Sequence, residues 1–191
     1  MSYSECHKKE NIPEHIKLLS SVYPDCIITN KSDEHIKNYD LDLITTDKIK
    51  YQLECKSDSS RDDETVLVEL LANWWEEDEG LFNSKTFKID HCVRKELEIF
   101  VCRLHKTEKY RSTACQPFSA DIKYLFSYLA KEGNTSSYYV FNLLPLAKYA
   151  RKNWKNLTLI VNKEDSCSIM VKIPVADVMD YLIAKKDSPV Y

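Results

Sequence analysis

Apolar and polar residues alternate most clearly between Tyr39 and Lys56. The alternation runs through two short stretches, 40–44 and 49–56, which the polar segment Thr45–Lys48 separates. A period of two is typical of a half-buried strand, and a short polar break between two such stretches indicates a β-hairpin. The pattern therefore predicts two antiparallel strands with one apolar face and one charged face.

Helical spacing and breaker residues predict the elements on either side of this hairpin. Ile16, Leu19 and Tyr23 fall on one face of a segment that Pro13 opens and Pro24 ends, so a helix is expected there. Further helices are predicted over 62–75, 118–131, 145–154 and 174–184, and further strands over 26–29, 97–104, 137–143, 157–161 and 168–173. This mixed order favours an α/β fold, with a mixed central sheet flanked by helices.

Length and composition favour one domain over residues 1–191. A chain of 191 residues with 43% hydrophobic content can bury a substantial core. No apolar run approaches the roughly 20 residues that span a bilayer, so we expect an intracellular protein, cytoplasmic or nuclear, that is not secreted and has no membrane partner. Seven cysteines, an odd number spread over predicted elements, favour reduced thiols over a disulfide scaffold.

Charge and glycine content narrow the classes of binding site. The net charge of −3 argues against a broad basic surface, although a local basic stripe remains compatible with it. The two glycines, Gly80 and Gly133, exclude a glycine-rich phosphate loop and a dinucleotide fingerprint.

The charged face of the predicted hairpin is the strongest candidate for chemistry. Asp40 and Asp42 share a face of the first strand, and Glu54 and Lys56 share a face of the second. Asp42, Glu54 and the main-chain carbonyl of Cys55 are oxygen ligands that suit Mg²⁺ or Mn²⁺. Lys56 could position an attacking water and offset developing charge, which fits hydrolysis of a phosphodiester. The alternative is an ordinary polar outer face with cross-strand ion pairs.

The chain resembles the PD-(D/E)xK nuclease superfamily, which has the restriction-endonuclease-like fold. The resemblance is carried by Asp42, by the element Glu54-Cys55-Lys56, and by the predicted order of helix, strand, hairpin, helix and strand. The resemblance covers roughly residues 10–105 and implies that 106–191 completes or decorates the sheet. It also implies a metal-dependent nuclease acting on DNA. The prolyl-aspartate dipeptide of the family name is absent, so Asp40 and Asp42 compete for the ligand position, and Asp42 is favoured by its spacing.

Further residues are candidates for supporting roles. Glu14 matches an acid that members often carry on the first helix, Gln52 shares the face of Glu54, and Ser57 could contact phosphate just past the motif. A basic helical face suits either a nucleic-acid backbone or simple solvation, and consists of Lys148, Arg151, Lys152 and Lys155.

Three other interpretations remain open. The first is a cap-snatching-like RNA endonuclease, in which His15 on the first helix would join the acids. The second is a catalytically silent module of the same fold that binds nucleic acid or a protein partner. The third is a zinc site formed by Cys92, Cys102, His105 and Cys115. A homodimer is expected if the substrate is a two-fold symmetric duplex or junction.

Overall fold

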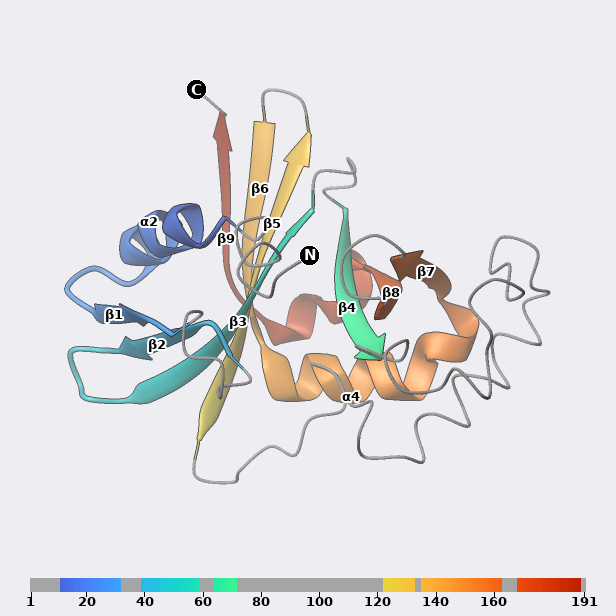
Figure 1. Cartoon of the computed structure of the whole chain (residues 1–191), viewed down its shortest axis with the longest axis horizontal. Coiled ribbons are helices and arrows are strands. Elements are labelled where there is room, and N and C mark those ends of the chain that lie inside the picture. The colour runs from blue at the N-terminus through green and yellow to red at the C-terminus, as the bar shows by residue number, and fades with distance from the viewer. Residues whose placement is uncertain are drawn as a thin grey trace, which may run out of the picture. The chain divides into compact units, whose positions relative to one another are not determined.

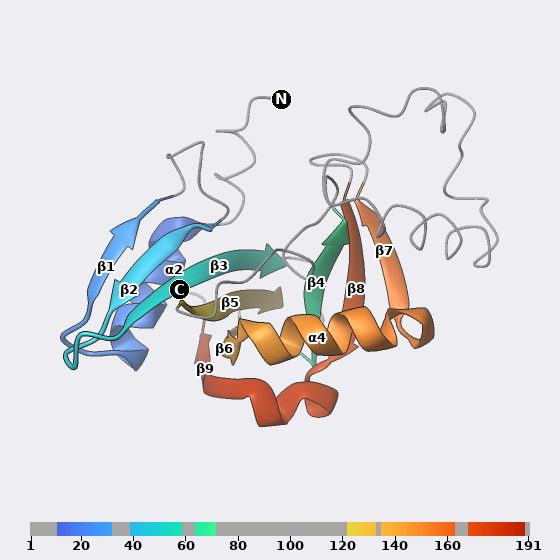
Figure 2. The ribbon, with the colours of Figure 1, turned by 90° about the horizontal axis from the view of Figure 1, so that it is seen from below.

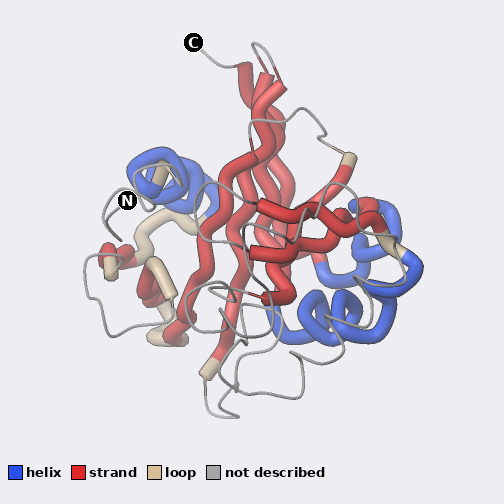
Figure 3. Tube along the Cα trace, turned by 45° about the vertical axis from the view of Figure 1, so that its right-hand side comes forward, coloured by secondary structure: helices blue, strands red, loops and turns tan. Residues whose placement is uncertain are grey.

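The computed structural model describes residues 11–31, 39–58, 64–71, 122–132, 135–162 and 168–189 (Figure 1). The fold is mixed α/β, and strands form most of the described chain (Figure 3). The chain divides into two compact units. The first contains Met1–Val66, Phe118–Leu146 and Pro174–Tyr191, and the second contains Leu67–Pro117 and Ala147–Ile173.

A six-stranded sheet forms the first unit, in the order β1-β2-β3-β5-β6-β9. Its strands are β1 (Ile27–Asn30), β2 (Leu41–Ile44), β3 (Lys50–Asp58), β5 (Lys123–Glu132), β6 (Thr135–Asn142) and β9 (Leu182–Pro189). Neighbouring strands are antiparallel except β3 and β5, which are parallel. Half of the strands in this sheet therefore come from residues beyond 106.

The predicted hairpin and first helix are confirmed. β2 and β3 pair antiparallel, from Leu41 opposite Leu53 to Ile44 opposite Lys50. Helix α2 (Ile12–Val22) begins with proline in its first turn and lies beside β1 and β2 (Figure 2). The apolar faces of the helix and hairpin form one buried cluster, which includes Ile12, Leu18, Leu19, Leu41, Leu43, Leu53, Cys55, Leu125 and Leu129.

The second unit contains a three-stranded sheet in the order β4-β8-β7. β4 (Thr65–Leu71) begins in the first unit and continues into the second, while β8 (Ser168–Pro174) pairs antiparallel with β7 (Thr158–Asn162). Helix α4 (Leu143–Asn153) is followed by the 3₁₀ helix η3 (Trp154–Asn156). The expected strands near 26–29, 137–143, 157–161 and 168–173 and the helix over 145–154 are therefore present.

The helix predicted over 62–75 is wrong where it can be compared, because Thr65–Leu71 is strand β4. Val66, Val68 and Leu70 are fully buried and Leu67 is nearly so. Apolar residues occur on both faces of this strand and only Glu69 interrupts them, so the run also satisfies helical spacing.

The helix predicted over 118–131 is wrong for the same reason. Lys123–Glu132 is strand β5, and all residues from Leu125 to Ala130 are buried. The final helix over 174–184 is also wrong, since the 3₁₀ helix η4 (Val175–Tyr181) leads directly into β9. The strand predicted over 97–104 lies outside the described residues.

Candidate functional site

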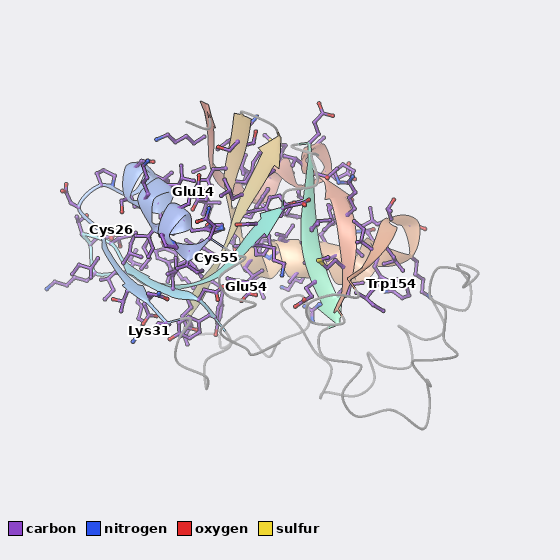
Figure 4. The ribbon with its side chains drawn as sticks, turned by 45° about the horizontal axis from the view of Figure 1, so that its top comes forward. Glu14, Cys26, Lys31, Glu54, Cys55 and Trp154 are labelled. Atoms are coloured by element: carbon purple, nitrogen blue, oxygen red, sulfur yellow. The ribbon has the colours of Figure 1, made fainter. Side chains whose placement is uncertain are left out.

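Strand β3 separates a core face from a polar face within the first unit. Leu53 and Cys55 are fully buried in the cluster beneath α2. Because side chains alternate along a strand, Glu54 and Lys56 project to the opposite face. Figure 4 labels Glu54 and Cys55 on β3 and Glu14 on α2. The Glu-x-Lys element thus lies on the face that α2 does not cover.

The neighbouring strands extend this polar face. Asp42 of β2 lies directly opposite Gln52, which shares the face of Glu54. On the other side, β5 places Phe126 beside Glu54 and Tyr128 beside Lys56. The structure therefore brings Asp42, Gln52, Glu54 and Lys56 onto one face, as the sequence predicts.

Asp42 is a buried carboxylate whose two oxygens have different surroundings. The residue is 8% exposed, and its Oδ2 lies 3.2 Å from Nζ of Lys50. Its Oδ1 is buried and has no hydrogen-bond partner in the part of the chain that the structure describes. An unsatisfied buried polar atom costs about 1–3 kcal/mol, and more when charged. A bound cation is one ligand that would satisfy such an oxygen.

Asp40 has a different role, although it is only two residues away. It is 4% exposed, and its Oδ2 accepts a hydrogen bond of 2.7 Å from the main-chain N–H of Cys55. Its own N–H donates to the carbonyl of Leu53 at 2.8 Å. Asp40 therefore holds β3 in place, and Asp42 is the better candidate for a metal ligand.

The second half of β3 is held differently from the first half. The register between β2 and β3 ends where Leu41 meets Leu53, whereas β5 pairs with β3 as far as Asp58. Asp58 continues the alternation of Glu54 and Lys56, and its Oδ2 accepts a hydrogen bond of 3.1 Å from the Tyr128 hydroxyl. Asp58 is not among the site residues predicted from the sequence, although the alternation of Glu54 and Lys56 extends to it.

A buried polar chain lies on the opposite, helix-facing side of the sheet. Nδ1 of His15 is 2.7 Å from Oγ of Ser127, and its Nε2 is 3.0 Å from Oγ of Ser57. The Ser127 hydroxyl is 2.6 Å from the Tyr138 hydroxyl. Burial raises the pKa of Tyr138 above its ordinary value of 10.0, which favours the neutral phenol. Ser57 is thus tied to α2 through His15.

Glu14 accepts a hydrogen bond from the Asn11 side chain at the start of α2. This helix packs on the side of Cys55, so the structure does not bring Glu14 onto the face of Glu54. His15 is directed to the same helix-facing side through its two serine partners. Of the candidates on α2, neither is placed beside Asp42.

The predicted basic face is exposed in the second unit. Lys148, Arg151 and Lys152 are exposed on α4, and Lys155 is exposed on η3. Nζ of Lys155 lies 5.7 Å from the centre of the Trp154 ring, a distance that allows a cation–π interaction. The basic face that the sequence predicts is thus exposed to solvent.

The remaining predictions concern metal clusters, membrane-spanning helices and cysteines. Within the described ranges, no group of three or more His, Cys, Asp or Glu residues is arranged to hold a metal ion, and no helix is long and apolar enough to cross a membrane. The residues of the alternative zinc site, Cys92, Cys102, His105 and Cys115, lie outside those ranges. Cys26 and Cys55 are free thiols.

Comparison with known proteins gives no match. No family model matches the chain, and neither a curated protein nor a solved structure matches it. The resemblance to the PD-(D/E)xK superfamily stays a prediction.

Proposed function

We propose that this protein is a divalent-metal-dependent nuclease that hydrolyses phosphodiester bonds, with DNA as the substrate. The observation that carries the proposal is the buried Asp42 carboxylate, whose Oδ1 lacks a hydrogen-bond partner among the described residues. It lies opposite Gln52, on the face that also carries Glu54 and Lys56. Lys50 compensates the charge at Oδ2, and a bound cation would do the same at Oδ1.

Mg²⁺ or Mn²⁺ fits this donor set. Asp42, Glu54 and the main-chain carbonyl of Cys55 would hold the ion, because hard cations prefer oxygen ligands. When bound, the ion would supply Lewis-acid stabilisation of charge on phosphate oxygens. Lys50 already contacts Asp42, with its Nζ 3.2 Å from Oδ2, but its side chain is 53% exposed and can return to solvent if an ion binds.

The remaining groups on this face have roles that follow from their chemistry. The Lys56 ammonium can donate hydrogen bonds to an attacking water and offset negative charge on the phosphate. The Gln52 amide can donate to a phosphate oxygen or accept from that water. Tyr128 holds Asp58 through its hydroxyl, which keeps the end of this strand face ordered.

The exposed cations of α4 and η3 support a nucleic-acid substrate. They provide charge for a phosphate backbone, independent of base sequence. The geometry of His15 favours DNA cleavage by the Glu-x-Lys element over the RNA-endonuclease alternative, which needs a histidine beside the acids. Both nitrogens of His15 instead contact serine hydroxyls on the helix-facing side of the sheet.

The proposed function is tested by cleavage of labelled single-stranded DNA, duplex DNA, branched DNA and RNA with Mg²⁺ or Mn²⁺. We expect metal-dependent cleavage of DNA, and a loss of at least about 100-fold in Glu54→Ala and Lys56→Ala, as for other groups that stabilise developing charge. Asp47→Ala and Lys17→Ala are matched controls, because both residues are exposed and lie away from the polar face.

Two results would contradict the proposal. The first is an absence of cleavage of every substrate together with an absence of metal binding by calorimetry, which would favour the silent binding module. The second is cleavage that survives in both site variants, which would move the chemistry to other residues. Preferential cleavage of RNA would contradict only the choice of DNA as the substrate, and the proposed metal site would stand.

The basic face has a separate test. Replacing Lys148 and Lys152 together with glutamine is expected to weaken DNA binding and to lower the dependence of affinity on salt concentration, because each phosphate contact contributes about 0.7–0.9 to that slope. The dissociation constant for DNA, measured from low to moderate salt concentration, gives this slope for the wild type and the variant. An unchanged slope would show that this face is merely solvated.

A further inference from the structure

Four polar side chains from four elements form a continuous chain behind the proposed site. They are Ser57 of β3, His15 of α2, Ser127 of β5 and Tyr138 of β6, linked at 3.0, 2.7 and 2.6 Å. His15 and Ser127 are fully buried and Tyr138 is 1% exposed. None of them is a metal ligand in the proposed function, so their arrangement needs its own explanation.

The buried end of the chain fixes the direction of its hydrogen bonds. In the described part of the protein, Ser127 is the hydrogen-bond partner of the Tyr138 hydroxyl. The phenol proton must therefore go to Ser127, because a buried donor without an acceptor costs about 1–3 kcal/mol. Ser127 then donates its own proton to Nδ1 of His15. This leaves the imidazole proton on Nε2, which donates to Ser57.

This tautomer excludes one attractive interpretation of the pair. A serine beside a histidine suggests an activated nucleophile, in which the histidine nitrogen accepts the serine proton. Here Nε2 of His15 already carries a proton and donates it, so it cannot take the proton of Ser57. The pair is therefore a structural link rather than a nucleophile and its base.

The position of Ser57 explains what the link holds. Ser57 directly follows Lys56, and the residue directly before Lys56, Cys55, is bound through its N–H by Asp40. In the described residues, the β2 register stops at Leu53, before this segment begins. Side-chain bonds on either side of Lys56 thus supplement the pairing with β5 where β2 no longer pairs.

We propose that His15 is a positioning residue, which holds Ser57 in the Nε2–H tautomer and so fixes the main chain that carries Lys56. This role rests on the proposed nuclease function, whereas the tautomer does not. A displacement of about 1 Å in a catalytic group can lower the rate about 100-fold. Holding the strand on both sides of Lys56 limits such displacements.

The tautomer is tested without any activity measurement. Nitrogen NMR of protein labelled at its histidines distinguishes the two neutral forms, and His15→Gln assigns the signal among the five histidines. We expect the Nε2–H form in the wild type. Tyr138→Phe removes the donor that fixes the direction, so the Nδ1–H form should then gain population. An Nδ1–H form in the wild type would overturn the inference.

The positioning role is tested by comparing His15→Gln with His15→Leu. A glutamine amide can donate to Ser57 and accept from Ser127, as neutral histidine does, and should keep kcat within a few-fold of the wild type. His15→Leu should lower kcat about 10- to 100-fold, with KM and the Mg²⁺ dissociation constant unchanged. Equal losses in both variants, or a change in metal affinity instead of kcat, would overturn the role.

Ser57→Ala gives a second measurement if His15→Leu does not fold. It removes the same link from a half-buried position at the end of β3, and the same loss of kcat is expected. An unchanged kcat in Ser57→Ala would overturn the positioning role. If the wild type cleaves no nucleic acid, the proposed function fails and this role with it, while the NMR result still decides the tautomer.

Discussion

His15 on one face of the six-stranded sheet and Asp42 on the other are buried polar residues with opposite hydrogen-bonding states. On the face beneath α2, both nitrogens of His15 are hydrogen-bonded, and the chain ends in a protonated phenol. On the opposite face, Asp42 has a buried oxygen without a hydrogen-bond partner in the described ranges. A fully satisfied polar group stabilises the fold, whereas an unsatisfied one costs free energy unless a ligand or water pairs with it. The comparison thus separates residues that hold the strand from the residue proposed to bind an ion.

The largest expected difference between the faces concerns stability. Leu53→Ala should lower the free energy of unfolding by about 2–5 kcal/mol, because it leaves a cavity in the core beneath α2. Gln52→Ala, one residue away on the half-buried polar face, should change it by about 0.5 kcal/mol or less. Urea unfolding monitored by circular dichroism measures both. Similar losses would show that the polar face is packed like the core.

Mg²⁺ should stabilise the protein through Asp42. At an ion concentration about 100 times its dissociation constant, the free energy of unfolding should rise by about 2.7 kcal/mol. Asp42→Asn should abolish most of this gain, while Asp47→Asn in the exposed hairpin turn should retain it. Thermal unfolding with Mg²⁺ and with a chelator gives the comparison. A full gain in Asp42→Asn would remove Asp42 from the set of metal ligands.

Asp40 should show the reverse behaviour. Asp40→Ala leaves the buried N–H of Cys55 without its carboxylate partner, and should cost about 1–3 kcal/mol of stability in the absence of metal. The dissociation constant for Mg²⁺, measured by calorimetry on the folded variant, should change little. A large loss of metal affinity with little loss of stability would exchange the roles assigned to Asp40 and Asp42.

The smallest expected effect is the dependence of stability on alkaline pH. Burial raises the pKa of Tyr138 above its ordinary value of 10.0, so folding favours the neutral phenol. This contribution is fully present below the unfolded pKa and is lost as the pH rises above it. Tyr138→Phe should cost about 1 kcal/mol near neutral pH through the lost hydrogen bond.

The same variant should weaken the decline in stability above about pH 10. Tyr23 also has a pKa raised by burial and adds its own pH dependence. The wild type and the variant are therefore compared by the slope of the free energy of unfolding against pH. Urea unfolding of wild type and Tyr138→Phe across this range measures them. Identical slopes would show that Tyr138 ionises as easily in the folded protein as in the unfolded chain.

Local patterns predicted the hairpin that carries the site. Strands β2 and β3 are joined by the short turn Thr45–Lys48, so their alternation and their pairing are both visible in adjacent sequence. Helix α2 was equally predictable, because Pro13 marks its first turn and Ile16 and Leu19 share a face. Placement of Asp42, Glu54 and Lys56 on one face follows from these elements alone.

Elements buried on both faces were not predictable in the same way. The apolar runs of β4 and β5 are each interrupted by one polar residue, Glu69 and Ser127, and a single polar residue does not distinguish a period of two from helical spacing. The partners of His15 also left no local signal, since Ser127 lies 112 residues further along the chain. The difference between Asp40 and Asp42 depends on which of them meets the N–H of Cys55, which only the three-dimensional structure shows.

The parallel pairing of β3 with β5 also constrains when the site can assemble. Asp58 meets Tyr128 across 70 residues of chain, and His15 meets Ser127 across 112. During synthesis, the hairpin with Asp42 and Glu54 leaves the ribosome well before the strand that supports it. Contacts of such long range slow folding, because a large loop must close before they form. The β3 edge of the nascent hairpin therefore lacks its β5 partner until β5 has been synthesised.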